Sequence, residues 1–277
     1  MQLFAPAKIN LSLKILGRRE DGFHEIDTLM TPISLHDELT IEPNESGSGI
    51  AFSCDEKTLP RGDENLVVRA AHRFFVEIEA EPRMRITLKK KIPQGAGLGG
   101  GSSDAASTLR GLNELHGAPL SLVRLTTLAA EIGSDVPFFL ACSAARCRGR
   151  GEDVEPVANL PKLPLLLLKP DFGVATASAY RHWLNSRELP GVDYAPQKLG
   201  DLVLENDLER PVFEKHIFLG LTKRWLREQP EVAAALLSGS GSTIFAVLRE
   251  RALAQGLAER AKRELDPGLW TCSCEMI

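Results

Sequence analysis

The strongest constraint on this chain is a glycine-rich segment that follows an alternating strand pattern and precedes a run of small residues. Residues 93–106 read Pro-Gln-Gly-Ala-Gly-Leu-Gly-Gly-Gly-Ser-Ser-Asp-Ala-Ala, with five glycines in the seven positions from 95 to 101. Without side chains, the main-chain N–H groups of such a segment are open to an anion. The Ser-Ser-Asp that follows can cap a helix, predicted over residues 103–115, whose positive end favours phosphate. The segment therefore predicts a phosphate-binding loop.

Other interpretations of this segment fit the surrounding residues less well. A flexible linker does not explain the strand pattern before it, the helix pattern after it or the apolar Leu98 within it. Gly95-x-Gly97-x-x-Gly100 matches the dinucleotide fingerprint, but that fold needs an acidic residue about 20 positions on, where this chain has the end of a helix. A P-loop needs Gly-Lys-Ser/Thr, and the glycine loop of a protein kinase lies between two strands.

Periodicity predicts a mixed architecture. Residues 7–15 alternate as a half-buried strand with Lys8 and Asn10 side by side on its polar face. Asp63 or Asn65 can cap a helix, and Asp135 opens a short one. The other predicted elements are strands at 84–88, 165–169 and 269–276, a strand–turn–strand at 236–248, and helices near 122–132, 176–183, 217–226 and 252–265. This irregular alternation favours an α+β or two-layer α/β fold over a barrel.

A proline-punctuated stretch, residues 156–164, suggests a domain boundary. We therefore expect an N-terminal domain over residues 1–157 and a C-terminal domain over residues 158–277. A chain of 277 residues is long enough for two modest domains, each with its own core.

Composition argues against two classes of partner. Lys plus Arg number 33 and Asp plus Glu 37, so the formal net charge of −4 provides no global basic field for nucleic acid. No apolar run approaches the roughly 20 residues that span a bilayer, and the N-terminal residues do not resemble a secretory signal. The five cysteines lack zinc-site spacing and predict reduced thiols. A cytoplasmic protein with a small-molecule substrate, and without a membrane or nucleic-acid partner, is expected.

At the glycine segment the chain resembles the GHMP kinase superfamily, whose phosphate-binding signature reads Pro-x-Gly-x-Gly-Leu-Gly-Ser/Gly-Ser-Ser. Five further segments resemble the branch of that superfamily whose substrate carries a cytidine diphosphate group. They are Ala-Pro-Ala-Lys-Ile-Asn-Leu at 5–11, Gly-Arg-Arg-x-Asp-Gly-Phe-His at 17–24, Glu-Asn-Leu-Val-Val-Arg-Ala-Ala at 64–71, Asp-Val-Pro-Phe-Phe at 135–139 and Ser-Gly-Ser-Gly-Ser-Thr-Ile-Phe at 238–245. The resemblance extends from about residue 5 to residue 248.

The resemblance implies a GHMP kinase fold, with an N-terminal half like domain 2 of ribosomal protein S5, a ferredoxin-like C-terminal half and the active cleft between them. It also implies transfer of the γ-phosphoryl group of ATP, with Mg²⁺, to a hydroxyl of the cytidyl substrate in non-mevalonate isoprenoid synthesis. No protein ligand to the metal is predicted. The expected assembly is a monomer or a homodimer. A GHMP kinase for another alcohol, such as homoserine or mevalonate, is the alternative, and a nucleotide-binding module without catalysis is a third.

The resemblance assigns roles to individual residues. The catalytic pair would be Lys8 and Asp135, with Asn10 and Asp135 near the acceptor alcohol. Phe23 and His24 would hold the cytosine, and Asn65 and Lys90 would lie at the adenine end. The phosphates of ATP would bind Pro93, Gln94, Gly95, Ala96, Gly97, Leu98, Gly99, Gly100, Gly101, Ser102 and Ser103.

Ordinary structural roles compete with several of these assignments. From spacing alone, Asp135 is a helix cap, and Lys8 and Asn10 are solvated residues on the polar face of a strand. Residues 238–242 could be a plain hairpin turn. Two departures from the family pattern also appear. Phe23 stands where tyrosine is usual, and Ala96 replaces a frequent glycine, which requires that Ala96 have a negative φ.

Overall fold

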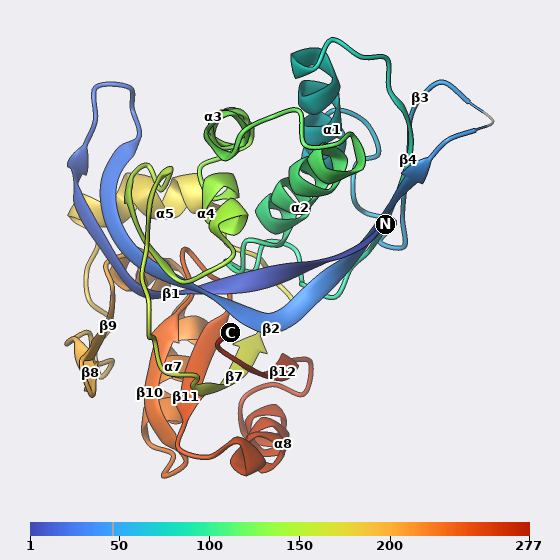
Figure 1. The fold of residues 1–277 in the computed structure, drawn as a ribbon. Helices are drawn as coiled ribbons and strands as arrows, with labels where there is room; N and C mark the ends of the chain where they lie inside the picture. Colours follow the sequence, from blue (N-terminus) through green and yellow to red (C-terminus); the bar gives the residue numbers. More distant parts are fainter. Residues whose placement is uncertain (46) are drawn as a thin grey trace.

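The computed structural model describes residues 1–45 and 47–277, and two β-sheets organise them (Figure 1). The larger sheet has the order β3-β4-β2-β1-β9-β8, with β5 pairing β2 and β6 pairing β5; the smaller has the order β10-β11-β7-β12. The larger sheet contains β1 (Gln2–Arg18), β2 (His24–Pro43), β3 (Gly49–Cys54), β4 (Arg83–Lys89), β5 (Ala145–Gly149), β6 (Asp153–Pro156), β8 (Gln197–Leu199) and β9 (Leu202–Asn206). The smaller contains β7 (Pro164–Lys169), β10 (Val232–Leu237), β11 (Ile244–Leu248) and β12 (Trp270–Glu275).

Helices cover the outer faces of both sheets. Figure 1 shows the helices of residues 66–141 on one side of the β1–β2 pair. The smaller sheet lies on the other side, together with the helices of residues 217–227 and 254–264. The first four helices are α1 (Leu66–Glu77), α2 (Gly100–Leu115), α3 (Leu122–Ile132) and α4 (Val136–Ala141). The others are α5 (Thr176–His182), α6 (Glu209–Lys215), α7 (Ile217–Arg227) and α8 (Ala254–Glu264).

The expectation of a half-buried strand over residues 7–15 is wrong at the strand's centre. Ala7, Ile9 and Leu11 pack with apolar residues of the smaller sheet, as predicted for the apolar face. Lys8 and Asn10, on the opposite face, are also buried. The glycine segment and α4 cover that face, because Gly99 lies directly against Lys8 and Phe139. A strand between two layers has no solvated side.

The predicted start of α2 also needs correction. The helix begins at Gly100, three residues before the expected start, and its N-cap is Gly99 in the left-handed conformation, without a side-chain cap hydrogen bond. Ser103 and Asp104 therefore lie inside the helix instead of capping it. A left-handed glycine at the cap leaves the first N–H groups of the helix for another acceptor. In contrast, Asn65 caps α1 as predicted, since its side chain accepts from the N–H of Val67.

The second half of the chain contributes to both sheets. Strand β9 pairs in parallel with β1, where Ser12 and Leu13 lie opposite Glu205 and Asn206. The carboxylate of Asp207 accepts the N–H of Ile15 at 2.7 Å. These contacts fix β9 and the residue after it against β1. Asn206 Nδ2 donates to the carbonyls of Leu237 and Gly239, both at 2.8 Å, and so holds the glycine-rich turn between β10 and β11 in the same region.

Candidate active site

A cavity of about 1360 Å³ lies between the glycine segment, β1, the start of β2 and α5. Its wall contains the residues predicted for function with one exception: Lys8, Asn10, Phe23, His24, Asn65, Lys90, Pro93, Gln94, Gly95, Ala96, Gly97, Leu98, Gly99, Gly100, Gly101, Ser102 and Asp135. The exception is Ser103, which is fully buried and donates its N–H to the carbonyl of Gly99 at 2.9 Å. Ser103 stabilises the first turn of α2 and does not face the cavity.

Hydrogen bonds hold the carbonyl groups of residues 93–103, the predicted phosphate loop, against the rest of the protein. The N–H of Lys8 donates to the carbonyl of Leu98 at 2.9 Å. The second glycine loop (residues 238–242) and Thr243 bind the carbonyls of residues 95–97, through Ser242 N, Thr243 N and Ser238 Oγ at 3.3, 3.2 and 3.0 Å. Across residues 1–45 and 47–277, no amide of residues 95–99 donates to the protein. These amides are therefore available to an anion.

Two glycines of the loop are required by its close packing. Gly97 has a φ of +74°, and a Cβ atom there would lie 2.1 Å from the carbonyl oxygen of Ser238. Gly99 has a φ of +70°, and its Cβ would lie 2.8 Å from Phe139. Ala96 does not have a positive φ. The condition under which alanine replaces glycine at this position is therefore met.

Lys8, Asn10 and Asp135 meet beside the phosphate loop. The Lys8 ammonium donates to Asn10 Oδ1 at 2.6 Å and lies 3.8 Å from Asp135 Oδ2. Asn10 in turn donates to Thr28 Oγ1 at 2.8 Å. Burial lowers the pKa of Lys8, and the charge of Asp135 opposes that shift. The side chain of Asp135 is 37% exposed and makes no cap hydrogen bond to α4, so its carboxylate is free to face a ligand.

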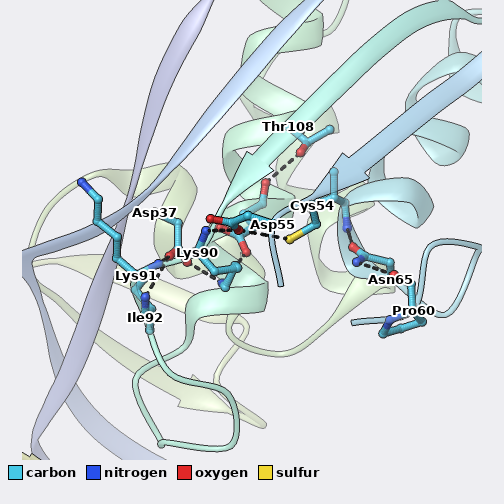
Figure 2. Close-up of polar contacts among 11 residues, drawn as sticks. Asp37, Cys54, Asp55, Pro60, Asn65, Lys90, Lys91, Ile92 and Thr108 are labelled. Carbon is cyan, nitrogen blue, oxygen red and sulfur yellow. Dashed lines mark hydrogen bonds and ion pairs between the residues drawn. The ribbon is translucent and has the colours of Figure 1, made fainter. Parts of the chain in front are cut away.

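Lys90 lies in a buried cluster with two carboxylates, those of Asp37 (Figure 2) and Asp104. Its ammonium binds Asp37 Oδ2, and it donates to Asp104 Oδ2 at 2.8 Å. Asp37 Oδ1 also accepts the N–H groups of Lys91 and Ile92, the latter at 2.8 Å. The cluster thus fixes the chain at the entry to the phosphate loop. The family resemblance placed Lys90 at the adenine end of the site, and its pairing with Asp37 across the sheet was not predictable from the local pattern.

The two carboxylates of this cluster differ in how many hydrogen bonds they accept. Asp37 accepts three hydrogen bonds, whereas Asp104 Oδ1 is buried without a partner among the described residues. Burial raises the pKa of Asp104 to about 7, with Lys90 opposing the shift and Asp37 adding to it. Two carboxylates that share one ammonium carry an excess negative charge. Protonation of Asp104 relieves that excess.

Asn65 uses its amide on the protein itself. Its Oδ1 accepts the N–H of Val67 at 2.9 Å, and its Nδ2 donates to the carbonyl of Pro60 at 2.9 Å (Figure 2). Asn65 therefore joins the start of α1 to the preceding loop. It shapes the end of the cavity where the resemblance predicts adenine, more than it offers polar groups to a ligand.

Aromatic side chains gather at the opposite end of the cavity. Phe23 is 51% exposed, and the ring of His24 lies 5.3 Å from that of Tyr180, centroid to centroid. Burial and then the charge of Arg18 lower the pKa of His24, so the imidazole is neutral near pH 7. Arg150 lies over the ring of Phe23. Flat rings with a neutral imidazole form a suitable site for a planar base.

Comparisons with known proteins agree with this geometry. The sequence matches the family GHMP kinases N terminal domain over residues 65–143. The 4-diphosphocytidyl-2-C-methyl-D-erythritol kinase of Methylacidiphilum infernorum is 41% identical over 278 residues, covering 99% of this chain and 96% of the relative. The kinase of that name from Syntrophotalea carbinolica is 38% identical, covering 93% of this chain and 94% of the relative. The chain belongs to the 4-diphosphocytidyl-2-C-methyl-D-erythritol kinase family.

Solved structures place this kinase family within a wider fold. A crystal structure of 4-(cytidine 5'-diphospho)-2C-methyl-D-erythritol kinase matches with a TM-score of 0.81 and 36% identity, over 100% of this chain and 99% of the other. A homoserine kinase from Cytophaga hutchinsonii matches with a TM-score of 0.66 at 18% identity, over 100% of this chain and 94% of the other, which shows a shared fold alone. The predicted GHMP kinase fold and the family resemblance are both confirmed.

Sequence reasoning missed several residues of this kinase's cavity region. Tyr180 and Arg150 line the cavity, and Asp37 fixes the phosphate loop from behind. Tyr180 lies on a helix that the sequence predicted, but nothing in the helical pattern indicates which neighbour it faces. Arg150 lies in a turn between two strands of five and four residues, which are too short for the pattern to predict.

Proposed function

We propose that this kinase transfers the γ-phosphoryl group of ATP to the 2-hydroxyl of 4-diphosphocytidyl-2-C-methyl-D-erythritol, giving the 2-phosphate and ADP in the non-mevalonate route to isopentenyl diphosphate. One observation carries the proposal. A single cavity joins the open amides of the phosphate loop, the Lys8–Asp135 pair and an aromatic site suited to a base. The relatives named for this reaction cover nearly the whole chain.

The phosphate loop binds the triphosphate. The amides of residues 95–99 and the first turn of α2 donate to phosphate oxygens, and Ser102 adds a hydroxyl from the cavity wall. Ser103 contributes through the helix turn that it stabilises. The adenine lies towards Asn65 and Lys90, which also line the cavity.

The Lys8–Asp135 pair promotes the transfer itself. The acceptor oxygen forms a bond to the γ-phosphorus while the bond from that phosphorus to the β,γ-bridging oxygen breaks. The hydroxyl proton passes to Asp135, or is held by it as the bond forms. Lys8 stabilises the negative charge on the transferring group, and Asn10 fixes the Lys8 ammonium.

The cytosine lies between the rings of Phe23 and Tyr180, with His24 at its edge. Stacking of a base on an aromatic ring is worth about 1–3 kcal/mol. Phenylalanine in place of the usual tyrosine keeps this stacking face and loses the hydroxyl. An alcohol without a base has no use for these rings.

Mg²⁺ would be held at this site mainly by the phosphates of ATP. The described residues contain no group of three or more His, Cys, Asp or Glu that could hold a metal. Mg²⁺ in such sites takes one or two protein oxygens and completes its shell with phosphates and water. The carboxylate of Asp135 and the hydroxyl of Ser102, both on the cavity wall, fit that limited role. When bound, the ion neutralises charge on the β- and γ-phosphates.

Three broader properties complete the proposal. Among the described residues, no helix is long and apolar enough to cross a membrane. We propose that the enzyme works in the cytoplasm, as a monomer or homodimer, on a small molecule and not on nucleic acid. We also propose a functional division at residues 157 and 158, although β8 and β9 join the larger sheet.

An assay of ADP release tests the proposed substrate. Purified enzyme with ATP and Mg²⁺ is offered the cytidyl substrate, uncytidylated methylerythritol phosphate, homoserine and mevalonate at equal concentrations. We expect turnover with the cytidyl substrate at least about 10²-fold above the others in kcat/KM, because two rings and the diphosphate contribute to binding. Preference for an alcohol without a base would overturn the assignment, and absence of turnover with any alcohol would favour a non-catalytic module.

A further inference from the structure

The turn between β5 and β6 carries an arginine between the two substrate-binding regions. The guanidinium carbon of Arg150 lies 4.9 Å from the centroid of the Phe23 ring, and its side chain lines the cavity. The next residue, Gly151, lies against the reaction centre, because a Cβ built there would be 3.6 Å from Asp135 Oδ1. Arg150 therefore lies over the ring proposed for the cytosine, and the residue after it lies near the carboxylate proposed for the acceptor hydroxyl.

The turn holds this arginine in a defined position. Gly151 donates its N–H to the carbonyl of Arg148 at 3.0 Å, and Arg150 donates its N–H to Glu152 Oε2 at 2.6 Å. The Arg150 side chain is 30% exposed, and its Nε lies 3.5 Å from Glu152 Oε1. Within residues 1–45 and 47–277, Glu152 is the one carboxylate paired with it, and that pair is longer than a good charge-assisted hydrogen bond. The guanidinium keeps the capacity to bind an anion.

The proposed substrate has an anion at this place. Its base and its acceptor alcohol are joined by a diphosphate, so with the base near Phe23 and the hydroxyl near Asp135, the phosphates lie between them. Arginine presents a planar fork of donors that matches phosphate oxygens. Two further arginines, Arg18 and Arg181, line the same cavity and add positive charge.

We propose that Arg150 binds the diphosphate bridge of the substrate and thereby fixes the distance between the base and the acceptor hydroxyl. The proposal rests on the proposed function. It is distinct from a second role that the geometry allows, in which Arg150 supports the ring of Phe23 and touches no phosphate. The two roles differ in which part of the ligand, the diphosphate or the base, binds more weakly when the guanidinium is removed.

Two small probes separate these roles. With a non-hydrolysable ATP analogue filling the nucleotide site, calorimetry measures the affinities of CDP and of cytidine for the wild type, Arg150→Gln and Arg150→Lys. We expect Arg150→Gln to lower the affinity for CDP by about tenfold or more, as for loss of a charged hydrogen bond. The affinity for cytidine should change by less than about threefold. Arg150→Lys keeps the charge and should lose less CDP affinity than Arg150→Gln. In turnover, KM for the cytidyl substrate rises while KM for ATP is unchanged.

Arg148→Gln is the matched control. Arg148 lies on the same hairpin but pairs with Glu155 on the surface, at 3.0 Å, and does not line the cavity. If Arg150→Gln lowers the affinities for CDP and for cytidine equally, Arg150 supports the ring of Phe23 and the proposal is overturned. An unchanged affinity for CDP would overturn the proposal as well. A wild-type enzyme that binds cytidine but gains nothing from the diphosphate would overturn this proposal alone. A wild type that binds neither probe would overturn the proposed function with it.

Discussion

The two ends of the cavity present different chemical groups to a ligand. The nucleotide end (the phosphate loop with Asn65 and Lys90) uses main-chain groups and buried, mutually bonded side chains. The cytidyl end (Phe23, His24, Tyr180 and Arg150) uses rings and a guanidinium, of which Phe23 is half exposed. Under the proposed function, the loop binds phosphate through main-chain groups that every sequence has, once its packing is correct. The cytidyl end depends on the chemistry of individual side chains.

This difference explains how one fold serves several substrates. The homoserine kinase and mevalonate kinases of similar fold share only 12–18% identity with this chain. A main-chain anion site can in principle survive such divergence, because it requires only backbone conformation and small residues at a few positions. Substrate choice can change through exposed side chains, at little cost to the core. Changes at the nucleotide end should therefore damage the fold and ATP binding together, and changes at the cytidyl end should affect one substrate.

Asp135→Asn should produce the largest effect on activity. It should alter the reaction centre, not the binding of ligand at either end of the cavity. The amide keeps the shape of the carboxylate but loses its charge and its ability to take a proton. We expect kcat to fall by about 10²–10⁴-fold, with KM for both substrates changed by no more than a few-fold. Asp153→Asn, at an exposed position of β6, serves as the control. Unchanged turnover in steady-state assays would remove Asp135 from the reaction centre.

Gly97→Ala should come next and act on the nucleotide end alone. The new methyl group would lie 2.1 Å from the carbonyl oxygen of Ser238, in a backbone conformation with φ of +74°. The two glycine loops must then separate, and we expect ATP affinity to fall by at least about tenfold, since strain of this kind costs about 1–3 kcal/mol. The melting temperature should fall as well.

Gly256→Ala provides the comparison for that variant. It lies in α8, where a Cβ meets nothing within 4 Å, so stability should be unchanged or slightly higher. Fluorescence titration with a labelled ATP analogue and thermal unfolding measure both effects. Normal ATP affinity in Gly97→Ala would contradict the view that packing of the loop controls phosphate binding.

The Asp104 carboxyl should give the nucleotide end a pH dependence of stability. Its folded pKa of about 7 exceeds the ordinary value of 3.8. Between these values the folded protein holds a proton that the unfolded chain has released, so this group's contribution to stability falls as pH rises from about 4 to about 7. The slope for one group does not exceed about 1.4 kcal/mol per pH unit.

Asp104→Asn removes this contribution and isolates it from other carboxylates. Denaturant unfolding at several pH values should give a wild-type minus variant difference that decreases from pH 4 to pH 7. The same difference for Asp201→Asn, an exposed position, should stay flat. Parallel pH profiles of wild type and Asp104→Asn would show that Asp104 is ionised throughout and that the cluster carries no shared proton.

The sequence predicted the parts of this site that depend on local pattern. Five closely spaced glycines and the apolar spacing of the helices are short-range signals, and the family motifs added the positions of Lys8 and Asp135. The start of α2 was predicted wrongly because Ser and Asp normally cap helices. Here a left-handed Gly99 ends the loop without a side-chain cap, so the first amides of the helix stay available to a ligand.

What the sequence did not predict depends on contacts between distant segments. Asp37 and Lys90 are 53 residues apart and meet because β2 pairs with β4. The burial of Lys8 requires a second layer over the polar face of β1, and no periodicity within residues 7–15 reveals that layer. Arg150 and Phe23 meet only once β5 pairs with β2. Such pairings follow from topology, which short strands do not signal.

Substitutions of Phe23 should give the smallest effects on activity, and they test the cytidyl end directly. Phe23→Leu removes a stacking face that is worth about 1–3 kcal/mol, so KM for the cytidyl substrate should rise about tenfold, while KM for ATP stays unchanged. Phe23→Tyr keeps the ring and restores the residue usual in the family, so its KM should lie within about twofold of the wild type, as for an exposed hydroxyl. Because Phe23 is half exposed, neither change should lower the melting temperature appreciably. Steady-state kinetics with each substrate varied in turn separates the two KM values, and a rise in KM for ATP in Phe23→Leu would mean that the two ends are not independent.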